Sequence, residues 1–173
     1  MAEILVLVDH VDGAVKKPTL ELLTLARRLG EPSAVYIGPG DAPAADLAKY
    51  GAEKVYAVDD AEIKGYLVAP KAEVLQQLVE KTSAGAVLIP SSAEGKEIAA
   101  RLSIKIDSGL ITDAVDISDS GVTTQSVFAG SYTVQAKVTK GTPIITVKPN
   151  PAAPAETGGA GAVVAFAPRV SDA

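Results

Sequence analysis

Four short apolar runs, separated by stretches of helical periodicity, constrain the fold of this chain more than any other feature. Each run is bounded by Gly, Pro or acidic residues, and the runs are 4–8, 34–37, 54–58 and 86–90. Continuous apolar runs of this length are typical of strands buried on both faces of a parallel sheet. The sequence therefore predicts an α/β fold with an open, Rossmann-like, mostly parallel sheet, in which right-handed crossovers place helices on both faces.

The stretches between the runs have apolar residues at three-to-four spacing, which predicts the connecting helices. We expect the first helix to end at Gly30, and a short second helix to be capped by Asp41 and closed by Gly51. Pro70 fits the first turn of a third helix that ends before Gly85. Each predicted helix therefore has a residue-level signal at one or both of its ends.

A fourth helix is predicted where Ser91 precedes Glu94 at the spacing of a capping box. We expect it to run to about Ile104, with Arg101 facing solvent, and to be followed by an acidic loop that includes Asp113. Beyond that loop, residues 123–128, 132–138 and 143–147 have the pattern of strands. The last third of the domain is therefore predicted to be a C-terminal β meander.

The composition changes sharply after this meander. Residues 149–162 are mostly Pro, Ala and Gly, with Asn150, Glu156 and Thr157, which predicts a linker or tail that follows an α/β domain of residues 1–148. Residues 163–173 are too few for a second domain. Two interpretations stay open: the chain is a fragment whose end is a terminal stub, or the last strand docks back on the domain before it.

Composition excludes several classes of function. A net charge of -5 argues against binding nucleic acid through its phosphates, and the N-terminal apolar run is too short for a signal peptide or a membrane span. We therefore expect a cytoplasmic protein that is not transmembrane. The chain has no cysteine and one histidine, which excludes thiolate-bound iron–sulfur clusters, disulfides and a paired-histidine metal site. No metal site is predicted.

A search for catalytic motifs is negative. The segment after the first strand lacks G-x-G-x-x-G, Gly95-Lys96 continues with an acid and is no Walker motif, and Gly38-Pro39-Gly40 is interpreted as a turn. His10 follows the first predicted strand, and ligands of open α/β sheets usually bind at such strand ends. A histidine at this position is nevertheless more often a loop residue that is hydrogen-bonded to the backbone. The carboxylate pairs Asp59-Asp60 and Asp113 with Asp116 are more often solvated acids. We predict no catalytic residue.

The order of short motifs along the chain is more specific than any one of them. The N-terminal motifs are residues 5–9, Gly13, Thr19 and residues 21–23. The later motifs are Gly95-Lys96-Glu97, Arg101-Leu102, Ser108-Gly109-Leu110, Thr112-Asp113, Phe128-Ala129-Gly130 and residues 143–149. In this order the chain resembles the N-terminal domain of the alpha subunit of electron transfer flavoprotein. The resemblance covers residues 3–149, and it departs from the family pattern at Asp9, Gln125-Ser126, Ser131 and Lys148.

The resemblance implies a heterodimeric electron carrier rather than an enzyme. Such a carrier, with its beta subunit, takes electrons through FAD from acyl-CoA dehydrogenases of fatty acid β-oxidation and related enzymes, and it passes them to electron transfer flavoprotein-quinone oxidoreductase. The family binds FAD mostly in a second alpha-subunit domain, which is absent from this sequence. We therefore expect residues 1–173 alone to bind no FAD and no other cofactor.

Four residues are candidates for contacts with the partner subunit. The resemblance implies that the segment Gly95–Ile117 is a scaffold, which sets the surface that meets the beta subunit and the flavin domain, and the candidate contact residues are Arg101, Asp113, Phe128 and Gly130. Interface centres favour arginine and aromatic side chains, although Arg101 can equally pair with an acid on its own surface. Two other functions stay open: a free-standing adenine-nucleotide-binding domain, and an interaction module without a flavin.

Overall fold

The computed structural model describes residues 1–60, 63 and 66–170. Among these residues the main sheet has nine strands, in the order β11-β5-β4-β1-β6-β10-β7-β8-β9. The strands are β1 (Glu3–Leu7), β4 (Glu31–Ile37), β5 (Lys54–Val58), β6 (Ala86–Pro90), β7 (Leu110–Ile117), β8 (Thr123–Val127), β9 (Tyr132–Ala136), β10 (Ile144–Val147) and β11 (Ala162–Ala165). A small antiparallel pair, β2 (His10–Val11) and β3 (Ala14–Val15), follows β1.

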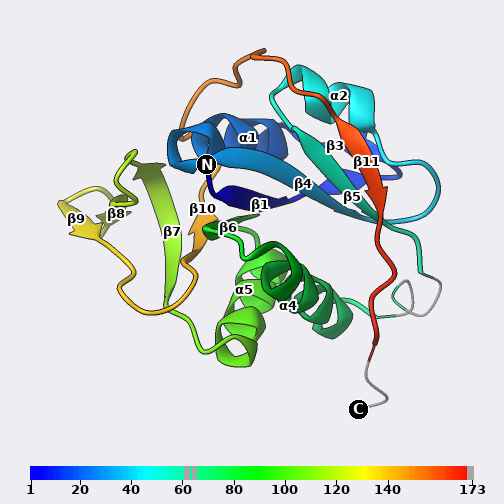
Figure 1. The fold of residues 1–173 in the computed structure, drawn as a ribbon. Coiled ribbons are helices and arrows are strands. Elements are labelled where there is room, and N and C mark those ends of the chain that lie inside the picture. Colours follow the sequence, from blue (N-terminus) through cyan, green and yellow to red (C-terminus); the bar gives the residue numbers. More distant parts are fainter. Residues whose placement is uncertain (61–62, 64–65, 171–173) are drawn as a thin grey trace.

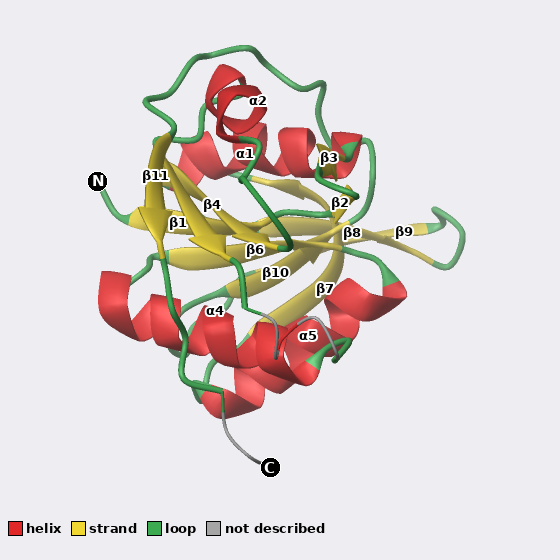
Figure 2. Ribbon diagram, turned by 90° about the vertical axis from the view of Figure 1, so that its right-hand side faces the viewer, coloured by secondary structure: helices red, strands yellow, loops and turns green. Residues whose placement is uncertain are grey.

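Helices cover both faces of the sheet, as Figures 1 and 2 show. The helices α1 (Lys17–Leu29) and α2 (Ala44–Lys49) lie on one face, and α4 (Ala69–Thr82) and α5 (Ala93–Lys105) lie on the other. Strand β1 alternates between the two layers, because Ile4 and Val6 pack under α1 whereas Leu5 and Leu7 pack toward α4 and α5. The open, mostly parallel α/β sheet predicted from the apolar runs is confirmed.

Some of the helix ends predicted from the sequence are confirmed and others are not. Pro70 lies in the first turn of α4, and Gly51, with φ of 104°, follows α2 as predicted. Asp41 does not cap α2, which begins behind Pro43 without a side-chain cap. Gly30 follows α1 in extended backbone, and a β-carbon on it would lie 2.2 Å from the carbonyl oxygen of Ala2. The glycine at position 30 is therefore required by a close approach.

The predicted capping box of α5 is wrong by one residue. Ser92, not Ser91, is the N-cap, and its Oγ accepts a hydrogen bond from the backbone N–H of Gly95 at 2.9 Å. The hydroxyl of Ser91 is directed instead to Asp113, at 2.5 Å between Oγ and Oδ1. Two adjacent serines offer the same cap chemistry, and the tertiary partner of Ser91 decides between them.

The predicted meander needs two corrections. The acidic loop expected after α5 is instead strand β7, in which Asp113 and Asp116 lie on partly exposed positions around the buried Ala114. Strand β10 does not extend the β8–β9 hairpin but runs parallel between β6 and β7. All four residues of β10 are buried, so the run belongs inside the sheet, where both of its faces are covered.

The C-terminal segment is ordered against the domain. Residues 149–161 pass over α1 and α2, and β11 then pairs in parallel with β5 (Figure 1, orange to red). Side chains of α1 form hydrogen bonds with the backbone of this segment. Glu21 accepts from the N–H of Asn150, Thr24 accepts from the N–H of Ala155, and Arg27 donates to the carbonyl of Gly158. The last strand therefore docks on the domain that precedes it.

Candidate functional site

Three of the four predicted contact residues lie in one shallow hollow, which we call the hairpin hollow. It is formed by β7 at Thr112 and Asp113, by residues 125–127 of β8, by the turn 128–130 and by Lys148 after β10. The hollow lies beside the carboxyl end of β10, where the sheet passes from parallel to antiparallel pairing. The fourth candidate, Arg101, is not among the residues that line it.

Asp113 of β7 is hydrogen-bonded to one residue of β10 and to one residue that follows β6. Its Oδ1 accepts from Ser91 after β6, and its backbone N–H donates to Oγ1 of the buried Thr146 in β10 at 3.0 Å. Asp113 itself has φ of 58° and lies at an irregularity in the β7–β10 pairing. The hydrogen bond from Ser91 outweighs burial and, with the ammonium groups of Lys96 and Lys148, lowers the pKa of Asp113. The site holds Asp113 as an anion.

Phe128 opens the turn between β8 and β9 and points its ring into solvent. It is 79% exposed, and its ring meets that of Tyr132 edge to face at 5.7 Å between centroids. Phe128, Ala129 and Gly130 all have positive φ, at 50°, 53° and 87°. Such backbone is unfavourable for the first two residues. This turn joins β8 to β9 and presents an exposed aromatic pair at the edge of the sheet.

Arg101 lies on the exposed side of α5, as predicted. Its guanidinium bonds Glu97 one turn earlier, at 3.1 Å from Nε and 2.9 Å from Nη2 to Oε1. Both side chains are about half exposed, so the pair contributes little to stability. The alternative that Arg101 pairs with an acid on its own surface describes the structure of this chain.

The carboxylate pair of Asp113 and Asp116 does not act as a unit. Asp116 bonds Arg28 of α1 at 2.7 Å, and Arg28 also donates to the carbonyl of Ile117. Asp113 is turned to Ser91 and Lys96 instead. The two acids therefore serve separate contacts, and their spacing in the sequence does not show which cations each one meets.

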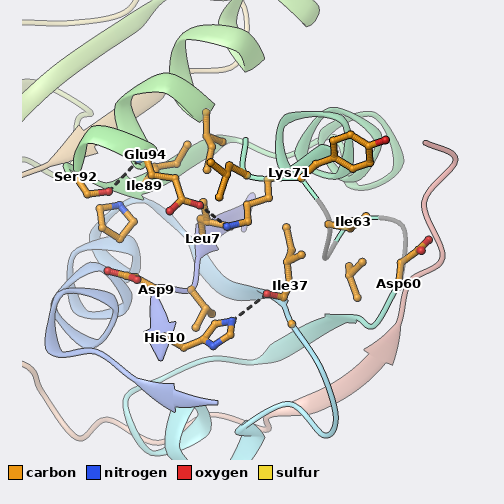
Figure 3. A pocket seen from close by; sticks show the side chains of 18 of the residues that line it. Leu7, Asp9, His10, Ile37, Asp60, Ile63, Lys71, Ile89, Ser92 and Glu94 are labelled. Carbon is orange, nitrogen blue, oxygen red and sulfur yellow. Dashed lines mark hydrogen bonds and ion pairs between the residues drawn. The ribbon is translucent and has the colours of Figure 1, made fainter. Parts of the chain in front are cut away.

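A second hollow, which we call the switch-point crevice, lies at the carboxyl ends of β1, β4, β5 and β6 (Figure 3). It has a volume of about 490 Å³, within the range of small-molecule sites. Strand β1 leads into a helix on one face of the sheet and β6 into a helix on the other, so the crevice lies at the topological switch point. The sequence does not predict this hollow, because its residues come from the ends of separate strands.

His10 lines the crevice with both ring nitrogens occupied. Its Nε2 lies 2.9 Å from the carbonyl oxygen of Ile37 (Figure 3). Its Nδ1 accepts from the N–H of Gly13 at 3.3 Å. These partners assign the hydrogen to Nε2 of a neutral ring. A β-carbon on Gly38 would lie 2.7 Å from the ring, so this glycine gives His10 room rather than cradling a phosphate. A histidine satisfied by the backbone was the commoner expectation, and the structure shows it.

Ion pairs involve charged side chains at the crevice. Lys71 of α4 forms an ion pair with Glu94 of α5 across the mouth (Figure 3). Asp9 pairs with Lys16 at 3.0 Å, and Asp60 also lines the wall. Among the described residues, the lining holds three carboxylates and one ammonium group, and Lys16 lies beside one of these carboxylates. Asp59, the neighbour of Asp60 in the sequence, is not among the lining residues.

The part of the chain that the structure describes contains no helix long and apolar enough to cross a bilayer. The model of the family described as the electron transfer flavoprotein domain matches residues 4–171. An electron transfer flavoprotein subunit alpha from Mycobacterium tuberculosis (strain ATCC 25618 / H37Rv) is 48% identical over 151 residues, which cover 86% of this chain and 48% of that protein.

Other relatives agree with this match. The subunit alpha of Mycobacterium leprae is 46% identical over 151 residues, which cover 86% of this chain and 48% of that protein. That of Syntrophomonas wolfei is 35% identical over 170 residues, which cover 95% of this chain and 53% of that protein. The chain thus spans about half the length of these relatives. It belongs to the electron transfer flavoprotein family and corresponds to an alpha-subunit N-terminal segment.

Proposed function

We propose that this chain is the scaffold and subunit-interface segment of an electron transfer flavoprotein alpha subunit. The intact heterodimer would carry electrons through FAD from acyl-CoA and related dehydrogenases to a quinone oxidoreductase. The observation that carries the proposal is the family match over residues 4–171, with 48% identity to an alpha subunit. In this role the chain performs no catalysis of its own and acts in the cytoplasm.

The described residues do not fit a flavin dinucleotide. A pyrophosphate needs a glycine-rich loop or cations, whereas the described lining of the switch-point crevice has three carboxylates and one paired ammonium group. At Gly38 and Gly95, the glycines of the described lining, an added β-carbon would collide with a neighbouring protein group, which is the ring of His10 or the carbonyl of Pro90. We therefore place FAD outside these residues and route no step through the crevice. The proposed task of this segment is to orient its partners.

The hairpin is the proposed docking surface for the beta subunit. Phe128, Tyr132 and Val134 are exposed on β8–β9, and β9 is the last strand of the sheet, so one edge of its backbone is open among the described strands. A partner strand can add to such an edge, with aromatic side chains as anchors. Asp113 and Gly130 shape the hollow beneath this edge, and Arg101 supplies a charge on the neighbouring helix.

Co-expression with a beta subunit tests this function. The chain, with any coding sequence that continues beyond Ala173, is purified with its partner by size exclusion while flavin absorbance is followed. We expect a yellow heterodimer peak. A colourless peak of monomer size from a soluble, extended chain would reject the electron-carrier role and leave only the fold.

Two variants test the proposed contact residues independently of the electron-carrier role. We expect Phe128→Ala to weaken the heterodimer by about tenfold or more, because buried aromatic anchors contribute over 1 kcal/mol to many interfaces. Arg101→Ala is expected to cost several-fold in affinity, about 1 kcal/mol. Ile104→Ala, which removes an 83% exposed apolar side chain outside the hairpin, is the matched control. Unchanged affinity in both test variants, measured by titration, would refute the contact assignments while leaving the family role standing.

A further inference from the structure

The β8–β9 hairpin, residues 122–136, is an arm whose direction depends on the strand at its base. It extends beyond the helices that cover the rest of the sheet (Figure 2). The arm contains no charged side chain, and every residue of β9 except Ala136 is exposed. Among the described strands, β9 pairs only with β8. The arm is therefore held mainly through the pairing of β8 with β7, and the shape of β7 decides where the ring of Phe128 lies.

Strand β7 departs from regular pairing on both of its edges. Toward β10, residues 112 and 113 both lie opposite Thr146. Toward β8, Val115 is an extra residue in the register. Such bulges bend a strand and increase its twist. They stand where β7 leaves the parallel sheet and begins the antiparallel arm, so they set the angle between the two.

The bulge opposite Thr146 is closed by side chains that replace the hydrogen bonds of the ladder. The carbonyl of Thr112 accepts from Nε2 of Gln125 in β8 at 2.7 Å, and the N–H of Asp113 donates to Oγ1 of Thr146 at 3.0 Å. With φ of 58°, Asp113 has a left-handed conformation, which a residue with a side chain keeps only where its surroundings hold it. The contacts around Asp113 are what holds it.

Three hydrogen bonds around Asp113 form a closed ring. Oγ of Ser91 lies 2.5 Å from Oδ1 of Asp113 and 3.0 Å from Oγ1 of Thr146. An ionised carboxylate can only accept, so Ser91 donates its one hydrogen to Asp113, and Thr146 therefore donates to Ser91. The N–H of Asp113 completes the ring by donating to Thr146. Hydrogen bonds that are linked in this way strengthen one another.

We propose that Asp113 is a positioning residue, which fixes the direction of the arm through the ring that it forms with Ser91 and Thr146. The ring ties the bulge of β7 to the buried strand β10 and to the segment that follows β6. The aromatic pair of Phe128 and Tyr132 is then held in place before a partner binds, which lowers the entropic cost of binding. Only this use of the arm in docking rests on the proposed function.

The isotope-labelled 173-residue chain tests the positioning role without a partner. Residual dipolar couplings report the direction of the arm relative to β1 and β4, and hydrogen exchange reports how firmly the arm is held. Asp113→Gly removes the carboxylate while glycine accepts the positive φ, so it separates the ring from backbone strain. We expect the amides of β8 and β9 to exchange about tenfold faster, and their couplings no longer to fit the alignment of β1 and β4. Asp113→Asn keeps an oxygen that accepts from Ser91 and should restore most of both values.

Two further variants test whether the ring acts as one unit. Ser91→Ala and Thr146→Val each remove one hydroxyl group of the ring. Because one missing link opens the ring, the double variant should speed exchange in the arm about as much as either single variant. Effects that multiply in the double variant would overturn the ring. Ser91→Ala, the mildest of these changes, decides the matter if Asp113→Gly does not fold.

Asp119→Gly is the matched control, since it makes the same change at an exposed position in the turn between β7 and β8. It should leave the direction and the protection of the arm as in the wild type. An arm that is unchanged in Asp113→Gly and Ser91→Ala would overturn the proposal, and so would equal loosening in Asp119→Gly.

Affinity for the co-expressed beta subunit tests the docking step. We expect Asp113→Gly to weaken the heterodimer about tenfold, and Asp113→Asn to weaken it much less. An unchanged affinity in Asp113→Gly, with the arm loosened, would overturn the docking step. A wild-type chain that binds no beta subunit would reject the interface role itself. The couplings measured without a partner keep these two failures apart.

Discussion

Glu3 is a carboxylate on which three donors converge at the amino ends of β1, β4 and β5. Its Oε1 accepts from Ser33 at 2.6 Å and from Tyr56 at 2.8 Å, and its Oε2 lies 3.2 Å from the ammonium of Lys54. Burial alone would raise the pKa of Glu3, but these hydrogen bonds and the charge of Lys54 lower it below its ordinary 4.5. Burial and the bond to Glu3 raise the pKa of Tyr56, so the phenol stays a donor.

This arrangement gives a prediction for acid stability. A carboxylate whose pKa is lowered by folding stabilises the fold above its unfolded-state value, and that stabilisation is lost as pH falls through the folded-state pKa. Glu3→Gln should therefore lower the free energy of unfolding most at pH above 4.5, and the difference from the wild type should shrink in more acidic solution. Urea unfolding at several pH values measures it. Glu97→Gln, an exposed matched change, should have little effect, and a Glu3→Gln difference that grows toward acid would contradict the assignment.

At the scale of elements, the C-terminal segment shows how a sequence of low complexity becomes ordered. Arg27 of α1 donates through Nη2 to the carbonyl of Gly158 at 2.5 Å and also reaches Glu53 at 3.4 Å. Beyond this anchor, β11 pairs with β5, and the N–H of Phe166 donates to the carbonyl of Ala57. The segment contributes backbone groups and the domain contributes the side chains that bind them.

Removing the anchor should loosen the strand. A hydrogen bond from a charged donor contributes about 1.5 kcal/mol, so Arg27→Ala should speed hydrogen exchange at the amides of Ala162 and Phe166 by about tenfold. Lys49→Ala is the control, because its pair with Glu156 is 55% exposed on both sides and contributes little. Exchange rates that rise equally in both variants would show that Arg27 has no special role.

The sequence predicts elements well where their signals are local. The four apolar runs predicted β1, β4, β5 and β6, because a strand buried on both faces needs a continuous apolar sequence. Pro70 predicted the start of α4, because the fixed φ of proline suits the first turn of a helix. Strand β7 was missed because Asp113 and Asp116 lie on partly exposed positions, so its alternation resembled an acidic loop. The place of β10 depends on pairing with β6 and β7, which no window of the sequence contains.

Some features of the candidate site were predictable from the sequence, and others depend on tertiary contacts. Phe128, Gly130 and Asp113 were candidates from the family resemblance, and the structure places all three at one hollow. The contact of Asp113 with Ser91 was not predictable, since it joins residues 22 positions apart through tertiary structure. The switch-point crevice was missed for the same reason, because its wall is assembled from the ends of several strands.

At the scale of the whole molecule, one sheet separates two hydrophobic layers. Leu23 of α1 lies in the layer that also contains Ile4 and Val6, and Leu75 of α4 lies in the layer with Leu5 and Val87. Both leucines are fully buried. Because successive residues of β1 pack into opposite layers, neither layer can lose its structure without exposing the strand that supports the other.

The two layers should therefore unfold together. Leu23→Ala and Leu75→Ala are each expected to cost about 2–5 kcal/mol from lost burial and the cavity left behind. Each should move a single urea transition rather than create a second one, and the double variant should lose about the sum of the two, since the residues share no partner across the sheet. Circular dichroism and amide hydrogen exchange measure the two quantities. If Leu23→Ala unfolded the α1 layer while amides of α4 stayed protected, the sheet would join two independent units, and the cooperative scaffold assumed for the subunit interface would be wrong.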